Sequence, residues 1–364
     1  MEHYKSTYEG AEVDAAIAAA LAIDQTLESA LAPLNVKINQ VNIKCSNNST
    51  DADLNIMDES GNIILQLAGG HIRTKNFDSS DAAKSGQHLK ICIIGNSYTA
   101  DSWMYLPFIL KNYGITIEVG CYIRSSGTLQ NAVNEWSTGA SSVSSAFYYI
   151  NTKTQTSWQT ISLSASPQMA TRYTNWDIMV LQQGSEASVD YSTYSYARQL
   201  EGLILDNVGK PVKFGWNINH NRASSGSDYE AVGNTILSNI SRVCEKEPMS
   251  MIFPYGTAVF NARTNQTLAA IGAGGNLWYS DMVHLQEGLP CYIANLANVE
   301  AIFREFFPHL SVMGDITRPT AANISAWAVK STNGTSVGVT EANCRLAQIC
   351  AVLANNYIFE IKTI

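Results

Sequence analysis

Apolar residues recur in two different patterns along this chain, and the change between them divides it near residue 86. Between residues 12 and 41 they follow alternating steps of four and three, broken by one aspartate. This spacing predicts a helix with a single apolar seam, which Pro33 ends or kinks. The seam can pack on copies of itself, giving a coiled-coil oligomer such as a trimer, or on its own domain, and both alternatives remain open. Its positions are Val13, Ile17, Ala20, Asp24, Leu27, Leu31, Leu34, Ile38 and Val41.

A short β pattern follows this segment. Residues 54–57 and 63–67 are mainly apolar, and the turn between them contains Gly61, so they are expected to form a pair of strands. Residues 73–88 are polar and have the composition of a linker. We therefore expect a helical stem over residues 1–50 and a small β-hairpin element with a linker over residues 51–85, neither of which carries candidate chemistry.

From residue 89 onward, short apolar runs alternate with helical periodicity. Continuously apolar strands between helices are typical of a parallel sheet covered on both faces, and such sheets carry their sites at the carboxyl ends of strands. We expect an α/β domain over residues 86–310 and a helical segment over residues 311–364 packed on it, with helices at 321–330 and 340–357. The expected strands are 89–94, 115–119, 178–181, 212–216 and 251–253, and the expected helices are 104–112, 194–207, 229–246 and 291–307.

Composition narrows the classes of function. The chain has 364 residues, 46% hydrophobic and 15% charged, with a net charge of -8 and no cluster of Lys and Arg. These values argue against nucleic-acid binding and against docking on anionic membranes.

Three further features of the sequence bear on where the protein is located and on whether it binds a metal. Acidic residues precede the short apolar run at 15–23, so a signal peptide is not expected, and no run has the length of a transmembrane helix. A cytoplasmic or virion-associated protein is the expectation. The seven cysteines form no C-x-x-C pair, so we expect neither a disulfide framework nor a metal or other cofactor.

Ser97 is the first candidate for chemistry. The apolar run 91–94 leads into Gly95-Asn96-Ser97, and a serine on a tight turn after a central strand is exposed as a nucleophile requires. An ordinary turn at a strand end is the alternative, because glycine, asparagine and serine are common there.

Asp281 and His284 are the second candidate. Their spacing puts both side chains on one side of a turn, so the carboxylate can orient the imidazole and stabilise its charged form. An aspartate that caps a helix near an unrelated histidine is the alternative. His220 is a rival base, but no carboxylate lies at the same spacing from it.

Two further blocks could stabilise an oxyanion. The apolar run 178–181 ends in Gln182-Gln183-Gly184, and a side-chain amide at a strand end can donate a hydrogen bond to developing negative charge. Gly127 lets a backbone N–H approach a substrate closely.

Taken in order, these blocks resemble the SGNH hydrolases, also called GDSL-type esterases, over residues 89–307. The resemblance implies a three-layer flavodoxin-like fold. It also implies that Ser97, His284 and Asp281 form a catalytic triad, and that the Ser97 N–H and Gly127 contribute to the oxyanion hole. The sequence departs from the family at Asn96, where an aspartate is usual, and it lacks the Gly-x-Asn block.

The third block instead resembles the sialate O-acetylesterase-like members, in which a glutamine replaces the asparagine. Gln183 is therefore the expected third donor and Gln182 its competitor. The resemblance implies an acetylesterase that acts on carbohydrate without a cofactor. The N-terminal segment loosely resembles the stems of phage tail-fibre-type proteins.

Substrate binding is assigned to polar and aromatic residues near these blocks. A non-catalytic virion or surface glycan-binding protein on a hydrolase scaffold, and a lipase or thioesterase of the same fold, are the alternatives. The candidates for substrate binding are Tyr98, Gln182, Trp216, His220 and Tyr279.

Overall fold

The computed structural model describes residues 41–44, 53–57, 63–68, 71–74, 88–141, 143–184, 186–208, 212–222, 229–246, 249–314 and 336–364. Before residue 88 it describes one antiparallel sheet in the order β1-β2-β3-β4, two strands more than expected. Its strands are β1 (Val41–Lys44), β2 (Asp53–Met57), β3 (Ile63–Ala68) and β4 (His71–Thr74). Val41, the last position of the apolar seam, lies in β1 and not in a helix, and the rest of the seam lies outside the described residues.

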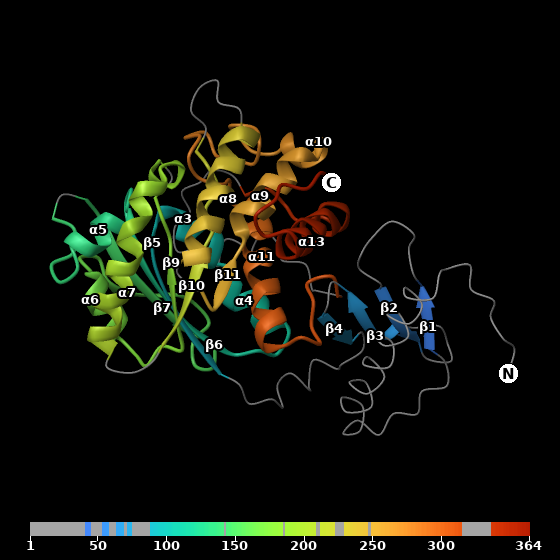
Figure 1. Cartoon of the computed structure of the whole chain (residues 1–364), viewed down its shortest axis with the longest axis horizontal. Helices are drawn as coiled ribbons and strands as arrows, with labels where there is room; N and C mark the ends of the chain where they lie inside the picture. Colours follow the sequence, from blue (N-terminus) through green and yellow to red (C-terminus); the bar gives the residue numbers. More distant parts are fainter. Residues whose placement is uncertain are drawn as a thin grey trace, which may run out of the picture.

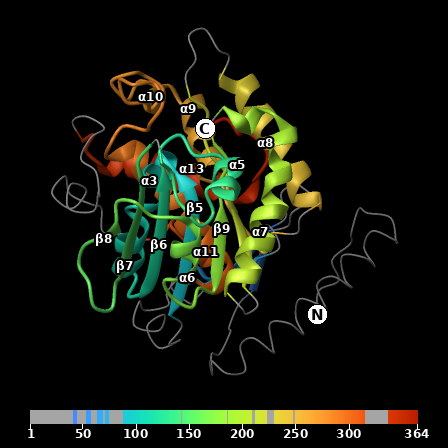
Figure 2. The ribbon, with the colours of Figure 1, turned by 90° about the vertical axis from the view of Figure 1, so that its left-hand side faces the viewer.

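A sheet of seven strands organises the rest of the chain, in the order β11-β10-β9-β5-β6-β7-β8. Figure 2 shows β8, β7, β6, β5 and β9 following one another across it. Its five parallel strands follow the 2-1-3-4-5 order of flavodoxin-like folds, and the order reverses between β5 and β9. The predicted fold class is thus confirmed. The parallel strands are β5 (Leu89–Asn96), β6 (Ile117–Arg124), β9 (Ile178–Leu181), β10 (Lys213–Asn217) and β11 (Met251–Phe253).

Two antiparallel strands extend this sheet beyond β6, which the expectation of a purely parallel sheet missed. They are β7 (Ser145–Asn151) and β8 (Gln159–Ser162). Because β7 runs against β6, its carboxyl end lies at the opposite edge from the ends of the parallel strands, and it contributes no residue to the candidate site.

Helices cover both faces of the sheet (Figure 1). Alternate side chains of each strand point to opposite faces, so they pack into two separate hydrophobic cores. In β5, Ile91 and Ile93 belong to one core, whereas Cys92 and Ile94 belong to the other. The first core is completed by α3 (Ser97–Trp103), α4 (Leu106–Asn112), α9 (Tyr255–Thr264), α11 (Leu289–Phe306) and α13 (Glu341–Asn356). The second is completed by α5 (Leu129–Asn134), α6 (Pro167–Arg172), α7 (Ser195–Val208) and α8 (Tyr229–Lys246). Three short helical segments complete the described elements, namely η2 (Ala187–Val189), η3 (Tyr191–Tyr194) and α10 (Gln266–Ala269).

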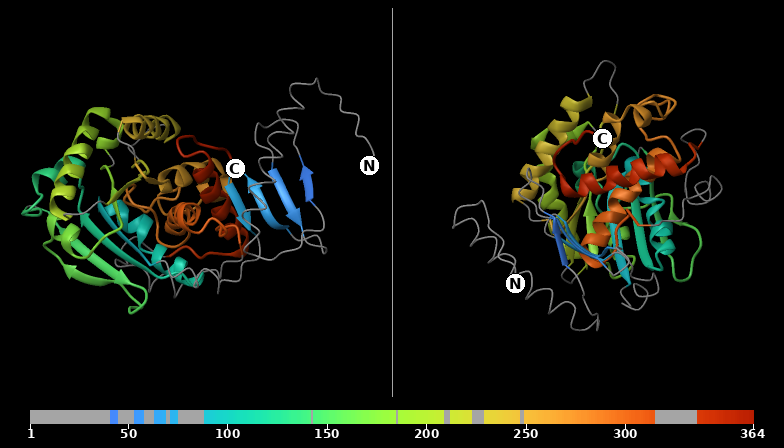
Figure 3. Two further views of the ribbon diagram at one scale, coloured as in Figure 1. Left: turned by 60° about the horizontal axis from the view of Figure 1, so that its bottom comes forward. Right: turned by 90° about the vertical axis from the view of Figure 1, so that its right-hand side faces the viewer.

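The C-terminal segment packs against the same domain. Helix α13, expected at 340–357, lies beside α11 and α9 (Figure 3). Beyond it, Thr257 Oγ1 donates to Ile358 O at 2.6 Å, and Lys362 N donates to Asn261 Oδ1 at 2.7 Å. The chain end is therefore bound along α9. The helix expected at 321–330 lies outside the described residues.

A charged cluster surrounds Glu118 near the amino ends of the parallel strands, at the edge opposite Ser97. Its carboxylate accepts hydrogen bonds from His88 Nε2 at 3.0 Å and from Tyr149 Oη at 2.8 Å, and pairs with Lys90 Nζ at 3.1 Å. Burial acts to raise the pKa of Glu118, but these three partners outweigh it and hold the pKa below its usual value.

No helix in the described part of the chain is long and apolar enough to cross a membrane. The cysteines within the described ranges, all but Cys45, are free thiols.

Candidate active site

The nucleophile candidate sits where β5 passes directly into α3. Asn96 has extended backbone angles, φ -133° and ψ -163°, and Ser97 is the first helical residue. Ser97 is partly exposed at the carboxyl end of β5, beside the point where the strand order reverses. Because the first N–H groups of a helix have no intrahelical acceptor, the N–H of Ser97 can donate to a ligand.

Asp281 and His284 form the hydrogen-bonded pair that their spacing predicts. His284 Nδ1 lies 2.6 Å from Asp281 Oδ2, and Asp281 Oδ1 accepts from Val283 N at 2.9 Å and from His284 N at 3.0 Å. Met282 takes a left-handed backbone conformation, φ 58°, which closes the turn. Asp281 therefore orients both the ring and the backbone of His284.

The electrostatics of this pair keep Asp281 ionised. Partial burial acts to raise its pKa, but the hydrogen bonds from the ring and backbone of His284 and from Val283 N outweigh it and lower the pKa below its usual value. A carboxylate in this position favours the tautomer of His284 that carries a proton on Nδ1 and leaves Nε2 as the base.

His284 packs against the helix that begins with Ser97. Its ring lies 6.0 Å, centroid to centroid, from the ring of Tyr98 in an edge-to-face arrangement. Among the described residues, His284 Nε2 is buried and has no hydrogen-bond partner, so the bond to Ser97 Oγ that a triad requires is not formed here. Catalytic hydrogen bonds are often loose until a substrate binds. The structure thus brings the three residues to one strand end and leaves the nitrogen of the base unengaged.

Asn96 joins the three loops that meet at this strand end. Its Oδ1 caps α3 by accepting from Tyr98 N at 3.0 Å and also accepts from Gln182 Nε2 at 2.7 Å. Its Nδ2 donates to Gly127 O at 3.0 Å and to Gln183 O at 3.1 Å. All four hydrogen-bonding positions of this buried amide are used, so Asn96 fixes the nucleophile turn against the loops after β6 and β9.

Gln182 belongs to a buried chain of polar side chains beneath Ser97. Its Oε1 accepts from Asn217 Nδ2 at 2.5 Å and from Thr99 Oγ1 at 3.3 Å. Asn298 on α11 extends the chain by donating to Asn217 Oδ1 at 3.3 Å. Because both ends of the Gln182 amide are engaged and the residue is buried, it serves the framework and does not face a substrate.

The expected oxyanion donors Gly127 and Gln183 are also engaged. Gly127 N donates to Arg124 O at 3.0 Å in a turn. The Nε2 of Gln183 donates to Thr193 Oγ1 at 3.0 Å, and the side chain is fully buried. The loops are packed tightly here, because a Cβ on Gly184 would lie 2.8 Å from Gly127 O. In this arrangement only the Ser97 N–H, of the three expected donors, is available to an oxyanion.

The other expected binding residues separate into buried and accessible positions. Trp216 is fully buried in the core beneath α7 and α8, so its assignment to substrate binding is corrected. Tyr98 and His220 are buried and pack on each other with ring centroids 4.3 Å apart. Tyr279 is partly exposed beside the Asp281 turn and remains the candidate that a substrate can reach.

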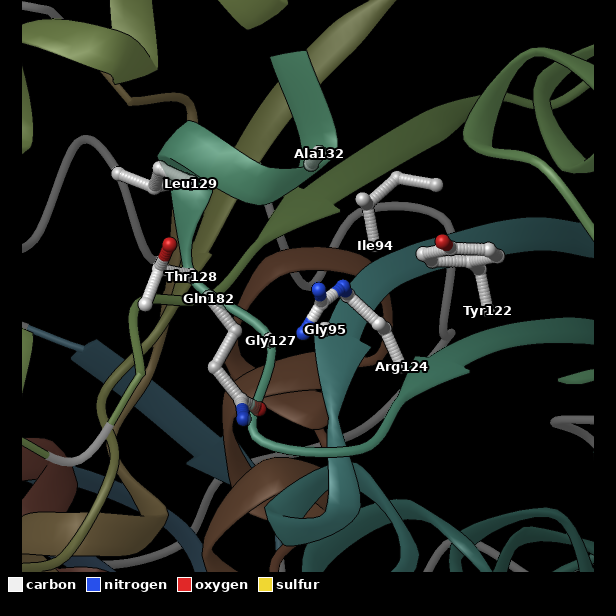
Figure 4. A pocket seen from close by; sticks show the side chains of 9 residues that line it. All are labelled: Ile94, Gly95, Tyr122, Arg124, Gly127, Thr128, Leu129, Ala132 and Gln182. Carbon is white, nitrogen blue, oxygen red and sulfur yellow. The ribbon is translucent and has the colours of Figure 1, made fainter. Parts of the chain in front are cut away.

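A small pocket lies under the strand ends, formed by residues of β5, β6 and α5 together with Gln182 (Figure 4). Gly127 lines it, but Ser97 and His284 do not. Arg124 in its wall is paired with Glu135 at 2.6 Å. The pocket is therefore a space behind the loops and not the place where the nucleophile and the base meet. Among the described residues, no three His, Cys, Asp or Glu side chains gather closely enough to hold a metal ion.

Sequence reasoning missed the roles of Asn96 and Asp101. Asn96 appeared only as a departure from a family motif, although an asparagine directly before a helix is a strong capping signal. Asp101 Oδ2 accepts from Leu285 N at 3.1 Å and is buried. Its position four residues after Ser97 places it on the same side of α3, which is the signal that could have identified it.

Comparisons with known proteins bear mainly on the fold. The sequence matches neither a protein-family model nor a curated protein. A solved structure of a DUF4886 family protein from Bacteroides uniformis is 20% identical, covers 76% of this chain and 98% of its own, and has a TM-score of 0.58. A protein described as a candidate SGNH hydrolase from Slackia heliotrinireducens is 17% identical, covers 59% of this chain and 100% of its own, and has a TM-score of 0.36. At these identities, the likeness to the Bacteroides protein is one of fold alone.

Proposed function

We propose that this protein is a serine ester hydrolase in which Ser97 is the nucleophile, His284 the general base and Asp281 the group that orients it. The observation that carries the proposal is the 2.6 Å contact between His284 Nδ1 and Asp281 Oδ2, which leaves Nε2 without a partner beside the helix that begins with Ser97.

The reaction follows from these roles. His284 Nε2 accepts the proton of Ser97 Oγ as the oxygen attacks the ester carbonyl, and then gives it to the leaving alcohol. A water molecule, activated by the same nitrogen, releases the acid in the second half of the reaction. The Ser97 N–H donates to the oxyanion; Gly127 N and the Gln183 amide join it only after exchanging their present partners.

A short acyl group on carbohydrate is the proposed substrate. The resemblance of the Gln183-Gly184 block to sialate O-acetylesterase-like enzymes supports an acetyl ester, and the accessible Tyr279 offers a ring that can stack on a sugar. The proposal also includes an oligomeric stem, formed by the residues before β1, that carries the enzyme to its substrate.

Acetate release from p-nitrophenyl acetate and from acetylated xylan tests this function. Ser97→Ala should remove activity by a factor of about 10⁴ or more, whereas Ser280→Ala, which removes an exposed serine in the loop before Asp281, should leave it unchanged. Equal activity in Ser97→Ala and the wild type would refute the proposal. A preference for long acyl chains would point to a lipase. Glycan binding without hydrolysis would point to a non-catalytic protein.

A further inference from the structure

Two hydrogen bonds hold the backbone on either side of His284. His220 Nε2 lies 3.0 Å from Val283 O, the carbonyl just before His284. Asp101 Oδ2 accepts from Leu285 N, just after it, at 3.1 Å. The two side chains come from different parts of the fold, since His220 follows β10 and Asp101 lies on α3.

The contact of His220 with Val283 makes its Nε2 a fixed donor. A carbonyl oxygen can only accept, so His220 Nε2 must carry the proton in this contact. The residue is fully buried under Tyr98. Burial first, and the nearby charge of Arg263 second, hold its pKa well below its usual value, so the ring is neutral. His220 Nε2 is therefore occupied, whereas its Nδ1 is buried and has no hydrogen-bond partner among the described residues.

Asp101 connects the same loop to the nucleophile. It lies one helical turn after Ser97, so its carboxylate fixes Leu285 relative to the helix that carries Ser97. The Nδ2 of Asn295 on α11 donates to Asp101 O at 2.9 Å and to Cys291 O at 2.7 Å, and its Oδ1 accepts from the N–H groups of Tyr105 and Leu106. The helix, the loop and α11 thus form one rigid support.

We propose that His220 and Asp101 are positioning residues that set the distance between His284 Nε2 and Ser97 Oγ. This inference rests on the proposed function, and it gives His220 a role through its Nε2 donor. Removing either hydrogen bond takes away one restraint on the backbone beside His284, which Asp281 Oδ1 and Tyr279 N continue to hold. A displacement of about 1 Å of a reacting group can cost about 100-fold in rate.

A matched pair of variants tests the role of His220. In His220→Gln the amide nitrogen reaches the place of Nε2 and keeps the bond to Val283 O, whereas in His220→Asn the amide is one methylene shorter and cannot. We expect kcat within about threefold of wild type for His220→Gln and a drop of about 100-fold for His220→Asn, with KM within about twofold for both and an unchanged pH profile for His220→Gln. Near-ultraviolet circular dichroism checks that each variant is folded.

The outcomes separate the two proposals. A 100-fold loss in folded His220→Gln, or wild-type kcat in folded His220→Asn, would overturn the positioning role while leaving the Ser97 result intact. A wild type whose activity is unaffected by Ser97→Ala would overturn the proposed function itself. If His220→Asn does not fold, Asp101→Asn, which keeps the acceptor for Leu285 N, and Asp101→Glu, which displaces it, are compared in the same way. Only Asp101→Glu should then lose kcat.

Discussion

Replacement of Asn96 should be among the most destabilising single changes at the site. Asn96→Ala removes a helix cap, for which about 1 kcal/mol is typical, and three further buried hydrogen bonds, at about 1 kcal/mol each. The expected loss in the free energy of unfolding is therefore about 4 kcal/mol. Because the four bonds share one network, the sum is not strictly additive.

Asn96→Ser provides the matched control. A serine hydroxyl can still cap α3 through Tyr98 N, but it cannot also donate to Gly127 O and Gln183 O. The free energy of unfolding of Asn96→Ser should be lower than that of the wild type by about 3 kcal/mol, a loss about 1 kcal/mol smaller than that of Asn96→Ala. Urea denaturation followed by near-ultraviolet circular dichroism measures both differences. A loss below about 1.5 kcal/mol for Asn96→Ala would refute the idea that Asn96 joins the three loops.

Asn96→Asp introduces the residue that is usual in SGNH hydrolases, and in this protein it should be harmful. The new oxygen would face two carbonyl oxygens, so the carboxyl is favoured when protonated and its pKa is raised in the folded state. The stability of Asn96→Asp relative to the wild type should therefore be highest in acid and should fall as the pH rises through that raised pKa. Melting temperatures of the variant and wild type across pH 4 to 8 would show this trend, and parallel curves would exclude it.

Three further predictions concern other parts of the fold. Because folding lowers the pKa of Glu118, its ionised carboxylate stabilises the folded protein above the unfolded-state pKa of about 4.3, and this stabilisation is lost as the pH falls through the folded-state pKa. Glu118→Gln should therefore flatten the acid side of the curve of melting temperature against pH. Ser126 has φ 53°, so Ser126→Gly should raise the unfolding free energy by about 0.5–1 kcal/mol, and a lower melting temperature would contradict this. In Gly256→Ala the Cβ would lie 2.5 Å from Asn219 O, so a loss of about 3 kcal/mol in urea denaturation is expected, and an unchanged midpoint would disprove the close approach.

The parallel strands and long helices could be predicted because each carries its own apolar signal. The expected bounds of β9, α8 and β11 agree with the structure, and those of α7 differ by one residue at each end. These elements each bury a continuous run or one helical face, so local sequence is sufficient to identify them.

Helix α3 escaped prediction because its buried side chains are largely polar. Thr99, Asp101 and Ser102 are buried, and they are satisfied by residues distant in sequence, such as Asn217, whose Nδ2 donates to Ser102 Oγ at 3.3 Å. An apolar pattern cannot reveal a helix that is buried through long-range hydrogen bonds. Strand β8 was missed for a related reason, since its residues are polar and partly exposed at the edge of the sheet.

The same limit applied to the site. Spacing alone predicted the contact between Asp281 and His284, because both lie in one turn. It could not show that Gln182 and Gln183 are bound within the framework, because some of their contacts join residues far apart in sequence. Gln182 Nε2 donates to Asn96 Oδ1, 86 positions away, and Gln183 Oε1 accepts from Leu129 N, 54 positions away.

The binding of the chain end along α9 has a consequence for the order of folding. Ile364 N donates to Thr264 Oγ1 at 3.1 Å across 100 positions of sequence, and Ile358, Phe359 and Ile361 pack on the second core. Such contacts have a high loop-closure entropy and are expected to form late. During synthesis, part of the apolar surface of α8 and α9 therefore stays uncovered until residues 358–364 have left the ribosome. A pause of translation in this interval would extend the time in which the nascent chain is prone to aggregate.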